Sequence, residues 1–365
     1  MIDSKIFADL DSFSQYLPQT IGKYTFEQLI GKGGYSRVFL VRTEKYNIDF
    51  VAKVMPVGMV KHETTDIDFL RQLEHPNIIR MYDTFKKGKF IYCILEYCPN
   101  GSLHQYMSRY SVPKNEVLIY LFQELLLGLN YMHSKQIAHR DIKPSNILID
   151  GYNRPKFIDF GISTKTEPGE FIGFFSCSKP FSSPEIVIEQ EYDPIVSDIW
   201  SLGVTFYYMA VGSLPWPSKP QKAMLKSIEQ GQYKIPKTVL PKIASLIRSM
   251  LHVNPKHRPN TQKLLQNSLF PQKQVLSIKF NIFPQGNSSI KEKAYLKKFI
   301  SPTSKQHSKV FFILKKPAKR CNHRICTTDT MTHTMTSLDA FHADDSSEVN
   351  KMPLMLQFEE NPDEY

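Results

Sequence analysis

Short runs rich in β-branched and aromatic residues, separated by turn residues, occupy positions 24–95 of this 365-residue sequence. Such runs predict strands, and here they are Tyr24–Leu29, Arg37–Arg42, Phe50–Val54 and Phe90–Leu95. Between the last two runs, Glu63–Leu73 has helical character, and Pro76 stops this helix ahead of a turn and strand predicted at 75–79. The pattern therefore predicts a small antiparallel sheet with one main helix.

The pattern changes to helical spacing after residue 115. Apolar residues recur three or four positions apart, at Leu118, Leu121, Leu125, Leu129 and Met132. One face of this helix is therefore expected to be buried over about five turns. Further apolar stretches at 195–211, 240–252 and 261–269 predict more helices. This part of the chain is predicted to form a larger, mainly helical lobe.

The helical periodicity ends after Phe270, where Ser, Thr, Lys and Asp become frequent. We therefore predict three parts of the chain. They are an N-terminal extension at 1–23, a folded domain at 24–270, and a tail at 271–365 that is largely disordered.

The chain has a net charge of +11, and the charged residues of the tail are unevenly placed. Residues 271–320 hold 12 Lys and Arg against one Glu, whereas residues 321–365 hold 2 against 9 Asp and Glu. The stretch 291–316 interleaves lysines with apolar residues, as a calmodulin target or an autoinhibitory segment does, although Pro302 interrupts any long helix. We expect a solvated extension and no nucleic-acid partner.

Several features indicate a soluble protein of the cytoplasm, or of the nucleus. No run approaches the roughly 20 apolar residues that span a bilayer, and acidic residues occupy the start, where a secretory signal would be basic and then apolar. The five cysteines are odd in number and scattered, which predicts reduced thiols. Cys321, Cys326 and His323 lack a fourth ligand, so no zinc site is expected there.

The stretch IGKGGYSRV at 30–38 is the first that carries chemistry. Gly31 and Gly33 would let a hairpin backbone approach a phosphate chain closely, although a simple tight turn explains the same glycines. About fifteen residues further on, VAKV places Lys53 in a strand. A strand lysine is usually a solvated side chain, but its position after the hairpin predicts a phosphate contact.

Two later stretches, HRDIKPSN and FIDFG, supply carboxylates and an amide. Asn146 and Asp159 offer the oxygen ligands that magnesium takes beside substrate phosphates. Asp141, in a loop with Lys143 and Asn146, is placed to orient a hydroxyl and accept its proton. The alternative interpretation makes Asp141 a turn cap.

These four motifs, in this order and spacing, resemble the eukaryotic protein kinase family over residues 24–270. HRDIKPSN resembles the serine/threonine kinases, and HPNIIRMYDTF and LEYCPNGSL resemble the calcium/calmodulin- and AMP-activated-kinase-related group. The resemblance implies an α+β, bilobal protein-kinase fold. It also implies an enzyme that transfers the γ-phosphoryl group of ATP, with Mg²⁺, to serine or threonine hydroxyls of protein substrates.

The resemblance implies a role for each candidate site residue. Those implied to contact the nucleotide are Ile30, Gly31, Gly33, Val38, Ala52, Lys53, Glu96, Cys98 and Leu148, with Ala52 and Leu148 on either side of the adenine and the backbone of Glu96 and Cys98 at its edge. Those implied to act on the phosphoryl group are Asp141 as base, Lys143 at the γ-phosphate, and Asn146 and Asp159 as magnesium ligands. Ser178 is implied to lie near the substrate hydroxyl.

Further residues are implied to support these. Asp198 would brace the loop of Asp141, and Glu185 would pair with Arg258. The lobes would be linked by an apolar stack of Leu70, Met81, His139 and Phe160.

The sequence departs from the family pattern at two positions in the first lobe. Ser36 replaces the third glycine of the hairpin, and Asp66 replaces the helix glutamate that pairs with Lys53. Because aspartate is one methylene shorter, Glu63, about one turn earlier, is the alternative partner of Lys53. These departures keep open a second function, a catalytically impaired kinase-fold scaffold. A nucleic-acid binder acting through the tail is a third, and it would associate in a strongly salt-dependent way.

Arg140, directly before Asp141, usually accompanies control by a phosphorylated loop. The position where related kinases carry the acceptor threonine is Phe174, and Ser176 lies nearby. Either Ser176 is phosphorylated, or the loop is arranged without phosphate.

Overall fold

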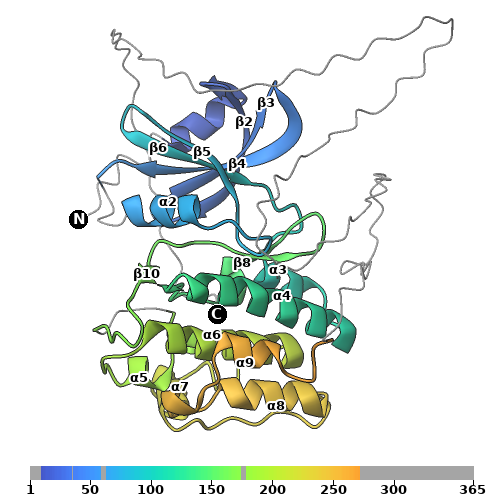
Figure 1. The fold of residues 1–365 in the computed structure, drawn as a ribbon. Helices are drawn as coiled ribbons and strands as arrows, with labels where there is room; N and C mark the ends of the chain where they lie inside the picture. Colours follow the sequence, from blue (N-terminus) through green and yellow to red (C-terminus); the bar gives the residue numbers. More distant parts are fainter. Residues whose placement is uncertain (1–9, 35, 59–62, 174–177, 272–365) are drawn as a thin grey trace, which may run out of the picture. The chain divides into compact units, whose positions relative to one another are not determined.

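A computed structural model of the chain describes residues 10–34, 36–58, 63–173 and 178–271 (Figure 1). The chain divides into two compact units, and all of these residues belong to the first, which comprises 1–288 and 354–365. The predictions for Ser176, for the stretch 291–316 and for Cys321 with its neighbours fall outside the described residues.

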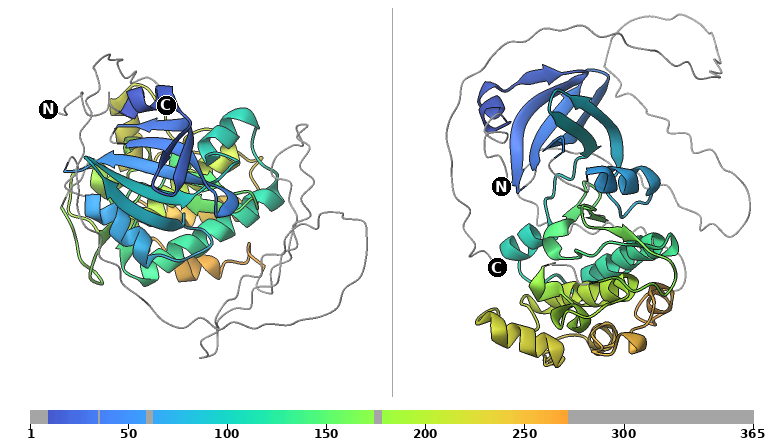
Figure 2. Two further views of the ribbon diagram at one scale, coloured as in Figure 1. Left: turned by 90° about the horizontal axis from the view of Figure 1, so that it is seen from above. Right: turned by 90° about the vertical axis from the view of Figure 1, so that its left-hand side faces the viewer.

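A six-stranded antiparallel sheet forms the first lobe, with strand order β1-β2-β3-β4-β6-β5. The strands are β1 (Gln19–Ile21), β2 (Tyr24–Gly33), β3 (Ser36–Thr43), β4 (Tyr46–Pro56), β5 (Met81–Lys87) and β6 (Phe90–Glu96). Helix α2 (Glu63–Gln72) lies against one side of the curled sheet (Figure 2). This arrangement confirms the predicted sheet with one main helix.

The two strands missing from the prediction, β1 and β5, are the edges of this sheet. Edge strands are half exposed, so their hydrophobic alternation is weak; in β5 not one side chain is buried. The strand predicted at 75–79 is wrong, because Ile78 makes only an isolated parallel bridge to Phe157 there. The next strand starts at Met81 instead.

The second lobe is mainly helical, as predicted. Its helices are α3 (Leu103–Arg109), α4 (Asn115–Ser134), α5 (Pro184–Val187), α6 (Pro194–Val211), α7 (Gln221–Glu229), α8 (Pro241–Met250) and α9 (Thr261–Leu265). Helix α6 lies in the core, where Phe206 stacks on Phe122 of α4 with ring centroids 3.8 Å apart. Helix α9 ends at Leu265, earlier than predicted. Leu269 and Phe270 are buried, but they lie in chain that is not helical.

Four short strands, which lie between α4 and α5 in the sequence, hold the loops that carry the candidate motifs. These are β7 (Ile137–Ala138), β8 (Ile147–Ile149), β9 (Pro155–Phe157) and β10 (Thr164–Lys165), which pair as β7 with β10 and β8 with β9. The stretch HRDIKPSN runs from β7 to β8, and FIDFG runs from β9 toward β10. Both candidate motifs are therefore held at the side of the helical lobe that meets the sheet.

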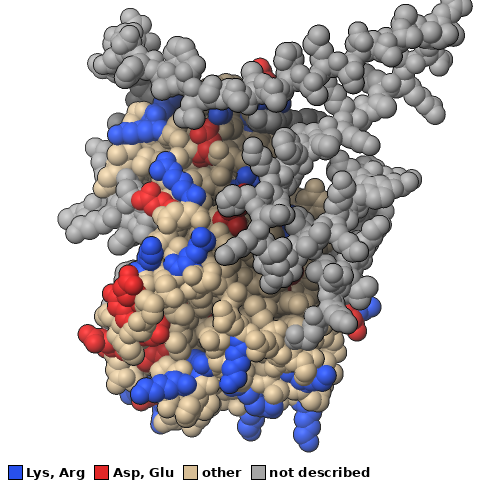
Figure 3. Space-filling model, in the orientation of Figure 1, with Lys and Arg blue, Asp and Glu red and all other residues tan. Residues whose placement is uncertain are grey.

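One group of basic side chains lies away from this junction. Lys and Arg side chains gather over the helices α7–α9, at the end of the helical lobe remote from α2 (Figure 3). Lys222, Lys226 and Lys242 are exposed there. Among the helices that the structure describes, none is long and apolar enough to cross a membrane.

Candidate active site

The loop that carries Asp141 is shaped by a buried carboxylate from α6. Asp198 Oδ2 accepts a hydrogen bond from the backbone N–H of His139 at 2.7 Å, and Oδ1 accepts one from Arg140 at 2.8 Å. A buried carboxylate requires such partners, since leaving it unpaired is costly. Arg140 has a left-handed φ of 68°, which is strained for an arginine. The predicted support of the loop by Asp198 is confirmed.

Asp141 gathers three of the candidate residues around its carboxylate. Its Oδ1 accepts a hydrogen bond from Ser178 Oγ at 2.8 Å, and its Oδ2 accepts one from Asn146 Nδ2 at 2.8 Å. The Nζ of Lys143 lies 3.0 Å from Oδ2 and donates to Ser178 Oγ at 2.7 Å. A hydroxyl oxygen thus lies between an aspartate and a lysine, which is the geometry required to orient an alcohol and remove its proton.

A second cluster joins Lys53 to two carboxylates. The Nζ of Lys53 lies 2.7 Å from Asp66 Oδ2 and 3.4 Å from Asp159 Oδ1. Burial disfavours the ammonium, but the charges of Asp66 and Asp159 outweigh this effect and raise the pKa of Lys53. Lys53 is therefore held as a cation, paired with Asp66. Glu63, the alternative partner, begins α2, and its side chain lies outside the described part of the chain.

Asp159 differs from Asp66 in being open to solvent. Its side chain is 49% exposed, and its backbone has a left-handed φ of 67°. The carboxyl group is partly desolvated, which favours the protonated acid, but the positive charge of Lys53 outweighs this and holds the pKa of Asp159 below its usual value. Asp159 is therefore an accessible anion, as a metal ligand must be.

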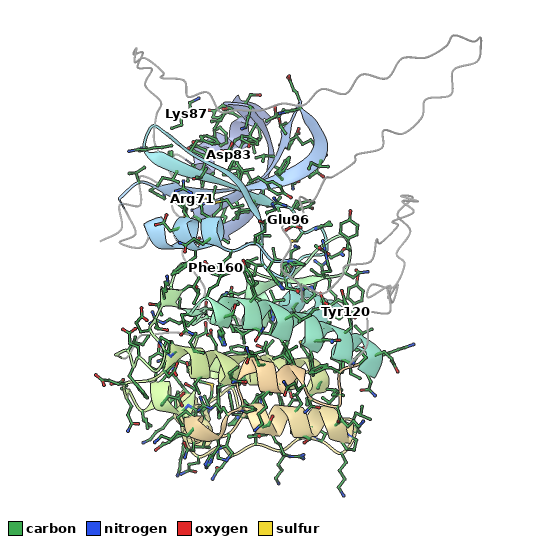
Figure 4. The ribbon with its side chains drawn as sticks, viewed as in Figure 1. Arg71, Asp83, Lys87, Glu96, Tyr120 and Phe160 are labelled. Carbon is green, nitrogen blue, oxygen red and sulfur yellow. The ribbon has the colours of Figure 1, made fainter. Side chains whose placement is uncertain are left out.

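The residue after Asp159 anchors the motif. Phe160 is fully buried, and its ring centroid lies 5.0 Å from that of His139. Leu70 belongs to the same core, and Met81 packs against it. The contact of His139 with Phe160 in the predicted stack is confirmed, and its continuation through Met81 and Leu70 stays a prediction. Figure 4 shows Phe160 between α2 and α4, and Glu96 at the end of β6.

The glycine-rich hairpin is formed by the end of β2 and the start of β3. Gly31 lies opposite Val38, and Gly33 lies opposite Ser36. A Cβ at Gly33 would lie 3.0 Å from Ser36 Oγ, which is tighter than ordinary contact. Ser36 itself is buried, so the hairpin accommodates the serine that replaces its third glycine.

One predicted nucleotide contact is wrong. Ala52 is 0% exposed and belongs to the apolar core of the sheet with Phe26 and Phe39. Side chains alternate between the two faces of a strand, so Ala52 points away from the face that carries Lys53. Val51 shares the face of Lys53, pairs with Leu95 and is partly exposed. Val51 is therefore the better candidate for this contact, and strict alternation from Lys53 would have identified it.

The other predicted contacts lie on separate elements. Val38 pairs with Lys53 across β3 and β4, Ile30 precedes the hairpin glycines on β2, and Leu148 is half-buried on β8. These contacts stay predictions. A buried lysine that sequence analysis also missed, Lys156, pairs with Glu96 Oε2 at 2.9 Å. Its signal, a lone lysine in the buried strand β9, is too weak to interpret without the structure.

Cys98 offers its backbone alone to a ligand. Its side chain is buried, and this burial raises the pKa of the thiol to about 12. The carbonyl oxygen accepts a hydrogen bond from the N–H of Gly101 at 3.3 Å. A role of Cys98 at the adenine edge would therefore use its backbone N–H or the second lone pair of its carbonyl oxygen.

A buried ion pair stabilises the helical lobe. Both terminal nitrogens of Arg258 bind Glu185, each at 2.7 Å. This bidentate geometry is the strongest that an arginine and a carboxylate form. The predicted pair is confirmed, and it lies outside the two clusters described above.

Comparisons with known proteins agree with this geometry. A family model of the protein kinase domain matches residues 24–270. Sperm motility kinase 2B of Mus musculus is 31% identical over 245 residues, which are 67% of this chain and 51% of that protein. The probable serine/threonine-protein kinase MARK-A of Dictyostelium discoideum is 32% identical over 254 residues, 68% of this chain and 24% of its own length.

A plant relative extends the comparison. CBL-interacting serine/threonine-protein kinase 12 of Arabidopsis thaliana is 30% identical over 271 residues, which are 72% of this chain and 55% of that protein. The chain therefore spans about half the length, or less, of these curated relatives.

Proposed function

The chain belongs to the eukaryotic protein kinase family, with serine/threonine kinases among its relatives, and on this premise we propose that it is an active protein kinase. It transfers the γ-phosphoryl group of Mg-ATP to serine or threonine hydroxyls of proteins. The observation that carries the proposal is the hydroxyl of Ser178 held between Asp141 and Lys143. The same pair can hold a substrate alcohol.

Phosphoryl transfer asks little covalent chemistry of the protein, so positioning and charge neutralisation supply most of the acceleration. In the proposed reaction, Asp141 accepts the proton of the attacking hydroxyl, and Lys143 stabilises the charge on the transferred group. Lys53, held as a cation, binds the α- and β-phosphates. Protein residues therefore contact the attacking group and the nucleotide phosphates at separate points.

The residues present fit a magnesium ion. The amide nitrogen of Asn146 donates to both the backbone and the carboxylate of Asp141, at 3.0 and 2.8 Å, which directs its oxygen elsewhere. Asp159 supplies an accessible carboxylate. Magnesium usually takes one or two protein oxygens beside substrate phosphates. When bound, the ion would neutralise phosphate charge, and Asn146 and Asp159 would hold it.

The competing function, a catalytically impaired scaffold, was suggested by Asp66 and Ser36. Asp66 reaches Lys53 despite its shorter side chain, and Ser36 fits within the hairpin. Neither substitution therefore removes a contact that the reaction requires, which supports the active enzyme.

The test is transfer of labelled γ-phosphate to a generic protein substrate with magnesium, followed by identification of the labelled amino acids. We expect label on serine and threonine. Binding of ATP without any transfer would favour the scaffold, and label confined to tyrosine would refute the proposed substrate class.

The tail at 291–316 is a separate proposal, as calmodulin target or autoinhibitory segment, and it rests on sequence alone. Protein ending at about residue 275 should turn over faster if the segment inhibits. Kinetics unchanged by both this truncation and added calcium-loaded calmodulin would remove both roles.

A further inference from the structure

A stretch outside the region that matches the kinase family packs on the sheet. Residues 10–13 are helical, and they are followed by a short 3₁₀ turn (Ser14–Tyr16) and β1. Leu10 is 3% exposed, and the ring of Phe13 makes edge contacts with Phe26 and Phe39, each at 5.6 Å between centroids. The stretch therefore covers the core on the face of the sheet that also contains Ala52.

The packed stretch brings one carboxylate to both strands of the glycine-rich hairpin. Asp11 accepts hydrogen bonds from Arg37 Nε at 2.8 Å and from Arg37 Nη2 at 3.2 Å. Its Oδ1 also lies 3.3 Å from Lys32 Nζ. Lys32 belongs to β2 and Arg37 to β3, and the two residues pair in the hairpin register. Asp11 therefore binds the hairpin on both sides.

The same arginine reaches the tip of the hairpin. Its Nη1 donates to the backbone carbonyls of Gly33 at 3.0 Å and of Ser36 at 3.2 Å. Gly33 and Ser36 are the last pair before the turn. The side chain of Arg37 is only 12% exposed, so its orientation is fixed by these partners. A chain of contacts thus connects Asp11 to the turn.

We propose that Asp11 is a positioning residue for nucleotide binding, which holds the glycine-rich hairpin in place through Arg37. Two glycines at the tip leave the backbone mobile unless something restrains it. Binding a phosphate chain under a mobile hairpin costs ordering entropy, and restraint in advance reduces that cost. The effect on the hairpin is independent of the proposed function, whereas its consequence for ATP rests on that function.

The direct test is hydrogen exchange in the nucleotide-free protein, with Asp11→Asn compared with wild type. We expect amides in peptides that cover 29–40 to exchange about two- to fivefold faster in the variant, the size of effect of a partly exposed ion pair. Peptides from β4 and β6 should be unchanged. Unchanged exchange in 29–40 would overturn the proposal, and so would equal acceleration everywhere, because that indicates general destabilisation.

The chain offers a matched control. Asp49 pairs with Arg42 Nε at 2.7 Å on the same sheet, and its side chain is exposed to nearly the same degree as that of Asp11. Asp49→Asn removes an Asp–Arg pair that does not contact the hairpin tip, although its arginine is more exposed than Arg37. We expect exchange in 29–40 to stay at the wild-type rate in this control, and an acceleration equal to that in Asp11→Asn would overturn the proposal.

The consequence for ATP is a change in KM with little change in kcat. Asp11→Asn should raise KM for ATP about two- to fivefold, and adding Arg37→Gln should raise it no further than Arg37→Gln alone. Fully additive effects would show that the two residues act separately and would overturn the proposed chain of contacts. If the wild-type protein transfers no phosphate, the kinase proposal is refuted instead. The hydrogen-exchange rates in 29–40 then still decide whether Asp11 positions the hairpin.

Discussion

The backbone N–H of Phe160 donates a hydrogen bond of 2.9 Å to Asp66 Oδ1, while the other oxygen of the same carboxylate binds Lys53. One short side chain therefore ties helix α2 to the FIDFG segment and to the strand lysine. Asp66 is only 6% exposed, so these two partners take the place of water at both carboxylate oxygens. Asp159 directly precedes Phe160, so the position of its accessible carboxylate depends on this link.

Asp66→Asn should lower turnover by at least about tenfold and destabilise the protein by about 3 kcal/mol, because it leaves the buried ammonium of Lys53 without its nearest counter-charge. Steady-state kinetics and denaturant unfolding measure the two effects. Asp68→Asn, on the same helix but with an exposed side chain, is the control and should behave as wild type. Wild-type turnover in Asp66→Asn would assign the partner role elsewhere, with Glu63 as the next candidate.

Val51 and Ala52 should respond in opposite ways to enlargement. Val51→Phe should raise KM for ATP, since the residue shares the face of Lys53, and should leave the melting temperature nearly unchanged. Ala52→Leu should overpack the core and destabilise the protein by about 1–3 kcal/mol. Nucleotide titration and thermal unfolding of both variants make the comparison. A reversed outcome would restore Ala52 as the adenine contact.

Asp141→Asn should bind ATP with nearly the wild-type affinity and transfer phosphate at least about 100-fold more slowly, the usual contribution of a catalytic base. The amide retains the shape of the carboxylate but cannot accept the proton. Equilibrium binding of a fluorescent ATP analogue, measured beside single-turnover transfer, separates the two steps. Normal transfer by this variant would remove Asp141 from the role of base.

His75 should make stability fall in mildly acidic solution. Burial, and then the charge of Lys156, lower the pKa of His75 to about 4, whereas the unfolded value is about 6.5. The unfolded chain therefore takes up a proton first, and stability falls as pH drops from about 6.5 to 4, by at most roughly 1.4 kcal/mol per pH unit. Unfolding free energies of wild type and His75→Gln should diverge in this interval. Parallel curves would contradict the prediction.

The loop of residues 161–183, which contains Ser176, should support turnover without phosphate. Arg140 donates to the carbonyl of Ile162 at 3.2 Å and to the hydroxyl of Tyr192 at 3.3 Å. Ile172 and Tyr192 also exchange two backbone hydrogen bonds. We expect phosphatase-treated protein to keep its turnover within about twofold, with no phosphate between 161 and 183 by mass spectrometry. Activity that requires phosphate on Ser176 would refute this.

Patterns of apolar residues predicted the elements that bury a face, such as α4 and the central strands, because burial determines which side chains a sequence can use. The edge strand β5 was not predicted for the same reason, because none of its side chains is buried. Motif spacing identified Asp141, Asn146 and Lys53, which the fold brings into two clusters. Ala52 was misassigned because an error of one residue along a strand reverses the face.

Long-range polar contacts outside the family motifs carry no comparable sequence signal. The link from Asp11 to Arg37 spans 26 residues, and Asp11 does not differ in its local sequence from a solvated surface group. The hydrogen bond from Phe160 to Asp66 spans 94 residues, and the position of Asp66 predicted only its pairing with Lys53. Only the folded chain shows these two contacts.

The aromatic cover that Phe13 provides has a practical consequence for recombinant work. A fragment cut at residue 24, where the family match begins, would present Phe26 and Phe39 to solvent on one side of the sheet. Such a fragment invites aggregation. A shortened protein intended for crystallisation or inhibitor screening should therefore begin before Leu10.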